Sequence, residues 1–284
     1  MGKGMFKRIR SRTSALAAGS AGLISVPGGV LAQSGQSVPW QITMQEAVTP
    51  VAAEIHWFHD FVNAIIIAIV AFILILLAIV VFRFNERRNP TPSRVTHNTL
   101  LEVMWTVVPV IILVVIAIPS FKLLYYADRT VDAEMTLKAI GNQWYWTYEY
   151  PDNGEFTFDA IMIEDNELKE GQPRLLTTDQ AIVLPVDTDI RLLTTASDVV
   201  HAWAMPAFGV KIDAVPGRTN ETWFRIEQPG MYYGQCSELC GVRHGFMPIM
   251  VKAVSKDAFN AWVEQAKKEF ANEDTARARV MARR

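Results

Sequence analysis

Two long runs of apolar residues dominate the first half of the chain. Residues 61–82 contain one amide and no charged side chain, and residues 103–121 contain no charged side chain. Each run reaches the roughly 20 residues that a helix needs to cross a bilayer. A hairpin buried in a soluble protein would need a large body to cover it, and the rest of the chain is too short to supply one. The pattern predicts a transmembrane hairpin over residues 59–124, in which Pro109 and Pro119 are tolerated.

After the hairpin, short runs of nearly alternating apolar and polar residues are separated by Asp, Asn, Gly and Pro. This pattern is typical of strands joined by turns. The runs cover residues 135–150, 181–186, 189–196, 221–226, 230–236 and 247–254. Residues 257–270 instead carry apolar side chains at helical spacing. Residues 125–271 are therefore predicted to form an all-β sandwich or barrel with a C-terminal helix, followed by a polar tail over residues 272–284.

The charges between the two apolar runs predict how the hairpin is oriented. The connection contains the basic residues Arg83, Arg87, Arg88 and Arg94 and the single acid Glu86. Connections rich in arginine and lysine stay in the cytoplasm, so residues 125–271 are expected on the periplasmic side.

Residues 1–32 are predicted to be a signal peptide. Basic side chains precede a mildly apolar stretch over residues 15–30, and a small-residue cleavage site follows at Ala32. The stretch is too short and too weakly apolar to span a bilayer, and its glycine and proline residues weaken it as a helix. An uncleaved anchor is the alternative. Cleavage would leave residues 33–58 as a periplasmic segment ahead of the hairpin, in a protein of the bacterial inner membrane.

The 284 residues carry a formal net charge of -2, but the charges are unevenly distributed. From Tyr125 to Arg284, Asp and Glu outnumber Lys and Arg by 24 to 17. An acidic exported domain suits a basic partner, because complementary charge speeds encounter. Ordinary solubility explains the same excess, and on charge alone it is the favoured explanation.

Both cysteines of the chain belong to a cluster of metal-ligating residue types. Cys236, Cys240, His244 and Met247 are spaced C-x3-C-x3-H-x2-M. Thiolate, imidazole and thioether together favour copper, since a thioether adds little for zinc. A mononuclear blue-copper site uses one thiolate, so the second cysteine thiolate of this cluster indicates two sulfurs that bridge a pair of copper ions. A disulfide is the alternative in an oxidising compartment, but it leaves His244 and Met247 unexplained.

A copper pair of this kind needs a second imidazole from elsewhere in the chain. His56 and His59 adjoin the first apolar run, and His97 lies on the cytoplasmic side. His201 remains as the candidate. It falls between two predicted strands, so we expect it on a loop at one end of the sandwich.

In these features the chain resembles subunit II of haem-copper cytochrome c oxidases of the aa3 type. The resemblance rests on residues 234–241 (GQCSELCG) with His244 and Met247, on residues 143–146 (QWYW), and on residues 213–218 (DAVPGR). It extends in order over residues 58–262. It implies a membrane-anchored, all-β protein, in which a cupredoxin-like sandwich with a C-terminal helix follows a two-helix hairpin.

The resemblance also implies a set of copper ligands. They are Cys236 and Cys240 as bridges, His201 and His244 as terminal ligands, Met247 as the weak sulfur donor, and Glu238 through its backbone carbonyl. The Glu238 carboxylate would bind a magnesium ion shared with subunit I, since hard cations prefer oxygen.

Other implied roles concern electron and proton transfer. Trp144 would accept the electron from cytochrome c, although a partly buried core tryptophan is the alternative. Glu149, Asp179 and Asp198 would form an acidic docking patch for cytochrome c, or would simply be solvated. Glu102 lies at the cytoplasmic end of the second apolar run. It is either an ordinary interfacial residue or the entrance of a proton path shared with subunit I.

The implied function is to accept electrons from cytochrome c and to pass them to haem a and the haem-copper site of subunit I. Oxygen reduction to water and proton pumping would take place in that subunit. The expected partners are subunit I, further oxidase subunits, cytochrome c and membrane lipid, with no nucleic acid.

Several other classes of protein share some of these features. A quinol oxidase subunit II would lack the copper ligands, and the copper domain of nitrous oxide reductase would lack the hairpin. A membrane-tethered copper chaperone would not need the aromatic run. The chain has no C-x-x-C-H haem attachment motif, so a fused cytochrome is not expected.

Overall fold

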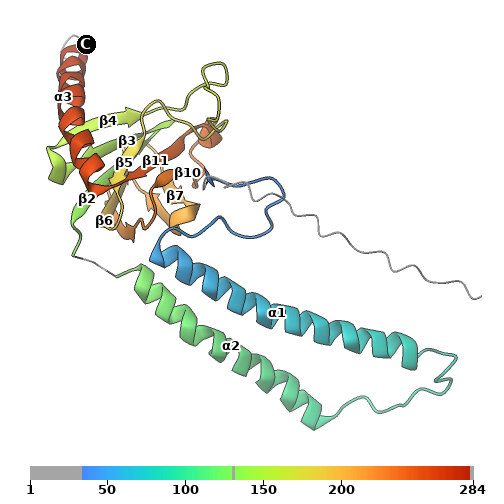
Figure 1. Ribbon diagram of the computed structural model, residues 1–284. Helices are drawn as coiled ribbons and strands as arrows, with labels where there is room; N and C mark the ends of the chain where they lie inside the picture. Colours follow the sequence, from blue (N-terminus) through green and yellow to red (C-terminus); the bar gives the residue numbers. More distant parts are fainter. Residues whose placement is uncertain (1–33, 130–131, 282–284) are drawn as a thin grey trace, which may run out of the picture. The chain divides into compact units, whose positions relative to one another are not determined.

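A computed structural model describes residues 34–129 and 132–281, and beyond Phe270 it describes the backbone alone. The expected signal peptide and its cleavage after Ala32 lie outside the described residues. Figure 1 labels the main elements. The helices are α1 (Pro50–Arg83), α2 (Thr99–Ala127) and α3 (Lys256–Met281), with short 3-10 turns η1 (Pro151–Asn153), η2 (Pro206–Phe208) and η3 (His244–Phe246). The strands are β1 (Ser34–Gly35), β2 (Met135–Asn142), β3 (Tyr145–Tyr150), β4 (Phe156–Ala160), β5 (Ile182–Pro185), β6 (Asp189–Ala196), β7 (His201–Met205), β8 (Val210–Ala214), β9 (Asn220–Arg225), β10 (Gly230–Cys236) and β11 (Pro248–Val254).

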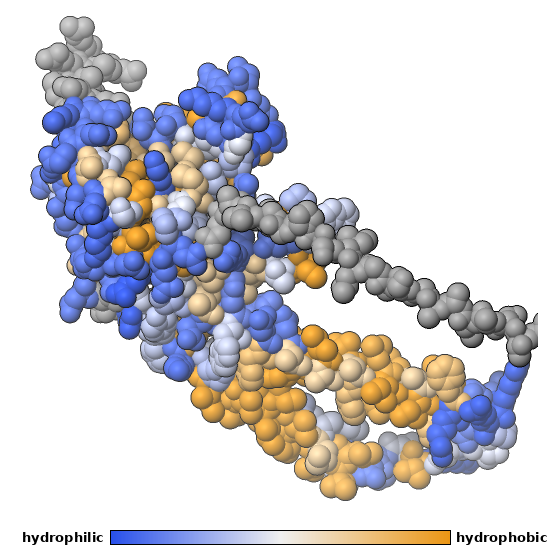
Figure 2. Space-filling view, in the orientation of Figure 1, coloured by the Kyte–Doolittle hydropathy of each residue, from blue (hydrophilic) through white to orange (hydrophobic). Residues whose placement is uncertain are grey.

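Helices α1 and α2 form the predicted hairpin, and both are longer than the apolar runs. Each begins at a capping side chain: Thr49 accepts a hydrogen bond from the amide of Ala52, and Asn98 from that of Leu101. Among the described residues these are the helices long and apolar enough to cross a membrane, and their most apolar windows are entirely unburied. Figure 2 shows this apolar surface along the hairpin. So large an apolar surface suits lipid rather than water.

In the described part of the chain, the strands form two sheets that pack face to face. One has the order β5-β11-β10-β7-β8, with β1 paired to β10, and the other has the order β4-β3-β2-β6-β9. Burial alternates along β2, β3 and β6, so one face of that sheet enters the core. Large side chains such as Trp146 and Tyr148 meet Trp203 and Ile249 of the other sheet in one buried cluster. The domain is therefore a β-sandwich, as predicted.

The structure differs from the predicted elements in several places. Residues 135–150 form two strands, β2 and β3, rather than one run. Strands β1, β4, β7 and β8 were not predicted. The apolar face of α3 covers the sandwich edge at β4, where Phe270 stacks on Phe158 with ring centroids 4.8 Å apart. The backbone of α3 continues to Met281, through most of the expected polar tail.

The start of α1 is attached to the sandwich by hydrogen bonds. The amide of Val48 donates to the carbonyl of Ala207 at 3.1 Å, and the Thr49 hydroxyl donates to the carbonyl of Phe208 at 2.7 Å. At the end of α2, the guanidinium of Arg129 lies 4.4 Å from the ring centroid of Trp223 in β9. Both helices of the hairpin therefore contact the sandwich at this end.

Candidate metal centre

The predicted ligand cluster occupies the connection between two adjacent antiparallel strands. Cys236 is the last residue of β10, and Met247 immediately precedes β11. Pairing of Gln235 with Pro248 closes the base of this loop, and the amide of Cys236 donates to the carbonyl of Met247 at 3.3 Å. Because the two strands are in register, the first and last ligands of the loop lie side by side.

His201 reaches the same place from a neighbouring strand. It is the first residue of β7 and is fully buried, so its expected position on a loop was wrong. Strand β7 pairs with β10 through Trp203 and Cys236, and the amide of Ser237 donates to the carbonyl of Ala202 at 3.0 Å. This pairing places the His201 imidazole beside the loop that carries the cysteines.

The sulfur atoms of the two cysteines lie 3.8 Å apart, and both cysteines are free and buried. A disulfide would need a sulfur separation of about 2.0 Å, so the structure has separate thiols here. His201 Nδ1 lies 3.8 Å from Cys236 Sγ. On the other side, Cys240 Sγ lies 3.5 Å from both His244 Nδ1 and Met247 Sδ.

The backbone oxygen of Glu238 lies 3.4 Å from Cys236 Sγ, while the Glu238 side chain is exposed. Each sulfur therefore has one imidazole and one weaker donor close by. A metal ion bonded to both thiolates at about 2.3 Å fits between sulfurs at the observed separation. The ligand atoms of three buried residues, His201, Cys236 and Cys240, all lie within 4.8 Å of one another. This group therefore suits a metal without rearrangement of the strands.

The environment makes the two thiols unequal. Burial acts to raise the pKa of Cys236, but hydrogen bonds lower it to about 7, and the contact with His201 lowers it most. Burial and the negative charge of Cys236 raise the pKa of Cys240 to about 12. The metal-free pair therefore retains a proton near neutral pH, and a metal that needs both thiolates must displace that proton.

Asp198 orients the buried imidazole. Its Oδ1 atom lies 2.9 Å from His201 Nε2, and its Oδ2 accepts the amide of Gln143 at 2.7 Å. Burial acts to raise the pKa of Asp198, but these hydrogen bonds and that from the Val199 amide lower it overall. An ionised carboxylate at Nε2 keeps the proton there and leaves Nδ1 free to bind metal. Asp198 was expected only in a docking patch, and its contact with His201 was not predicted.

Trp144 touches the cysteine loop directly. It is half-buried, and its indole N–H donates to the carbonyl of Cys240 at 3.2 Å. The side-chain amide of Gln143 donates to the same carbonyl at 2.8 Å. Trp146 is buried, with its ring centroid 6.0 Å from that of His201. The aromatic run was recognised in the sequence, but the contacts of Gln143 and Trp146 were not.

Gly141 is a further residue of the site that sequence reasoning missed. It lies in β2, in the opposite sheet, and a Cβ atom there would lie 2.7 Å from Cδ2 of His201. The imidazole thus occupies the space that a side chain at position 141 would need. The sequence offered no signal for this contact, because the two residues lie on strands of different sheets.

The remaining predicted site residues lie outside this cluster. Glu149 forms an ion pair with Lys138 at 2.8 Å, and the Asp179 carboxylate accepts the amide of Ile161 at 2.7 Å. Glu102 lies in the first turn of α2, where a negative charge also favours the helix dipole.

Two family models match the chain over most of its length. Residues 37–123 match "Cytochrome C oxidase subunit II, transmembrane domain", and residues 135–254 match "Cytochrome C oxidase subunit II, periplasmic domain". The probable cytochrome c oxidase subunit 2 of Rickettsia bellii is 50% identical over 244 residues, which cover 86% of this chain and 91% of the relative. Cytochrome c oxidase subunit 2 of Phytophthora megasperma is 47% identical, with coverage of 80% and 87%. The crystal structure of the periplasmic domain of subunit II of cytochrome oxidase from Bradyrhizobium japonicum is 56% identical, with a TM-score of 0.47, and covers 50% of this chain and 99% of that one.

Proposed function

The chain belongs to the cytochrome c oxidase subunit II family, and from this premise we propose that it is the electron-accepting subunit of its oxidase. It would take electrons from cytochrome c on the periplasmic side of the bacterial inner membrane. It would pass them to haem a and the haem-copper site of subunit I, where oxygen is reduced to water and protons are pumped.

This role is supported by the gathering of all the expected ligands around the two free thiols. Cys236 and Cys240 would hold two copper ions between them, with the other donors on either side. The other donors are His201, His244, Met247 and the carbonyl of Glu238. When bound, such a copper pair supplies a one-electron carrier of type CuA. His201, Cys236, Cys240 and Met247 are buried, and two strands and one loop hold the donors in place, so little rearrangement would accompany loading.

Trp144 is the proposed point at which an electron reaches the chain. Its indole N–H is bonded to the carbonyl of a proposed copper ligand, Cys240, which gives a short connection from the half-buried ring to the cluster. Glu149, Asp179 and Asp198 would attract a basic cytochrome c. Asp198 is 31% exposed, so it could contribute charge to docking while it also orients His201.

Two further sites complete the proposal. The exposed carboxylate of Glu238 would bind magnesium together with subunit I, while the Glu238 carbonyl faces Cys236. Glu102, at the far end of the hairpin from the sandwich, would mark the entrance of a proton path into subunit I.

Copper loading of the full chain in detergent tests the proposal. Two coppers per chain, with the visible and near-infrared absorption of a purple mixed-valence pair, are expected. One copper per chain with a blue spectrum would indicate a mononuclear site, and a colourless protein would indicate a dithiol that binds no copper pair. Either result would contradict the proposed function.

A further inference from the structure

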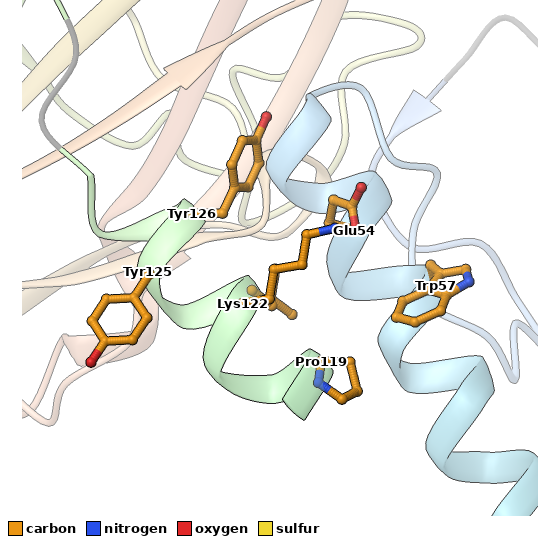
Figure 3. A pocket seen from close by; sticks show the side chains of 7 residues that line it. Glu54, Trp57, Pro119, Lys122, Tyr125 and Tyr126 are labelled. Atoms are coloured by element: carbon orange, nitrogen blue, oxygen red, sulfur yellow. The ribbon is translucent and has the colours of Figure 1, made fainter. Parts of the chain in front are cut away.

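A pocket of about 720 Å³ lies between α1 and α2, in the turns of both helices that are nearest the sandwich (Figure 3). Its walls include Glu54 and Trp57 from α1 and Lys122 and Tyr125 from α2. The volume is within the range of small-molecule sites, roughly 300 to 1,000 Å³. The pocket is far along the chain from the copper ligands and takes no part in the proposed electron transfer.

The pocket contains one positive and one negative side chain at the same depth. Glu54 lies four residues after the start of α1, and Lys122 lies five residues before the end of α2. With a rise of about 1.5 Å per residue, both lie roughly 6 to 8 Å from the helix ends. Figure 3 shows the two side chains pointing towards one another. In the described part of the chain, neither forms an ion pair or a side-chain hydrogen bond.

The surroundings of these charges correspond to the boundary between lipid headgroups and acyl chains. Trp57 is 56% exposed and Tyr125 is 74% exposed, and aromatic residues of this kind concentrate at membrane interfaces. Phe121, next to Lys122, and Ile118, one turn deeper in α2, present apolar surface. Ionised side chains in a membrane protein are costly unless they meet an opposite charge or water. A ligand that satisfies both must carry a negative and a positive group close together above an apolar portion.

We propose that this pocket binds a phosphatidylethanolamine headgroup. The lipid phosphate would pair with Lys122, and the primary ammonium would donate hydrogen bonds to the Glu54 carboxylate. The acyl chains would follow the exposed apolar surface of the hairpin. Phosphatidylglycerol offers only the negative group, and the trimethylammonium of phosphatidylcholine has no N–H to donate. Complementarity to both charges therefore selects the ethanolamine headgroup.

Native mass spectrometry of the full chain tests the proposal. The chain is released from nanodiscs that contain equal amounts of phosphatidylethanolamine, phosphatidylglycerol and phosphatidylcholine with identical acyl chains. A retained lipid is expected to be phosphatidylethanolamine. Glu54→Gln and Lys122→Gln should each lower its retention at least about tenfold, because each removes one charge-assisted hydrogen bond. The matched controls Glu86→Gln and Arg88→Gln, in the connection at the other end of the hairpin, should leave retention unchanged.

A double variant separates headgroup binding from loss of folding. Glu54→Lys combined with Lys122→Glu exchanges the two charges, so a zwitterionic headgroup should be retained again in the reversed orientation. Equal retention of phosphatidylglycerol or phosphatidylcholine would overturn the proposal. Retention that is unchanged in the single variants would also overturn it. The absence of any retained lipid would overturn it too, and would mean that the two charges pair directly or are covered by another subunit.

Discussion

Substitution of Gly141 by alanine should disturb the metal centre although Gly141 is not a ligand. The new Cβ atom would lie 2.7 Å from Cδ2, 2.8 Å from Cγ and 3.0 Å from Cβ of His201. Ordinary van der Waals contact begins near 3.4 Å, so the closest pair must separate by about 0.7 Å. His201 is fully buried and bonded to Asp198, so the imidazole cannot simply rotate away. Metal ligands tolerate displacements of only about 0.2 Å.

Two effects of this substitution are expected. Overpacking should lower the free energy of unfolding of the metal-free protein by about 1 to 3 kcal/mol. Displacement of the ligand should lower copper affinity about 10- to 100-fold, the range seen when the orientation of a ligand is disturbed. Chemical denaturation measures the first, and competition with a copper chelator measures the second.

Gly245→Ala is the matched control. Gly245 lies inside the ligand loop, between His244 and Met247, but a Cβ atom there would meet nothing within 4 Å. This variant should therefore bind copper normally. If Gly141→Ala loads two coppers with unchanged affinity, or if Gly245→Ala is equally damaging, the contact between the sheets does not position His201.

Three further predictions concern side chains of the site. Asp198→Ala should lower copper affinity by about 10- to 100-fold, and Asp198→Asn should lower it less, because asparagine keeps a hydrogen-bond acceptor. Competition with a copper chelator measures both affinities, and equal losses of affinity would contradict an orienting role for Asp198. Met247→Leu should leave two coppers bound and shift the reduction potential measured by voltammetry, so an unchanged potential would remove Met247 from the ligand set. Trp144→Ala should slow electron uptake from reduced cytochrome c in stopped-flow experiments. The copper spectrum should persist, because Gln143 still holds the carbonyl of Cys240, and normal uptake would place the electron path elsewhere.

Several of the strands that were predicted from the sequence have one buried face, although β5 is buried at every position and was predicted, and β4 alternates and was missed. Strand β6 alternates strictly between buried and half-buried residues, and the first half of the strand, DIRL, shows this alternation in the sequence as a period of two. Strand β7 is buried at every position, so its residues, HAWAM, show no such period. The hairpin was predictable for a different reason, since a bilayer needs helices of a length and composition that few other structures share.

The candidate ligands were predictable because most of them lie within a short loop. Residue types at close spacing identified the two cysteines, His244 and Met247, and elimination identified His201. The residues that position these ligands could not be found in this way. Gly141 and Asp198 act through contacts whose partners are set by strand pairing and sheet packing, and neither residue type is unusual in a β-domain.

The division of the candidate ligands between a loop and a neighbouring strand would couple copper binding to folding. A peptide of residues 236–247 would contain both thiols, one imidazole and the thioether, but not the second imidazole. His201 reaches the cluster only when β7 pairs with β10, and it is oriented only when Asp198 and Gly141 are in place. A copper pair bound at the proposed site would therefore stabilise the native sandwich selectively, because the unfolded chain cannot bring the same set of ligands together. The proposed electron transfer would benefit from the same arrangement, since ligands held by one sheet and packed against the other would move little when one electron arrives or leaves.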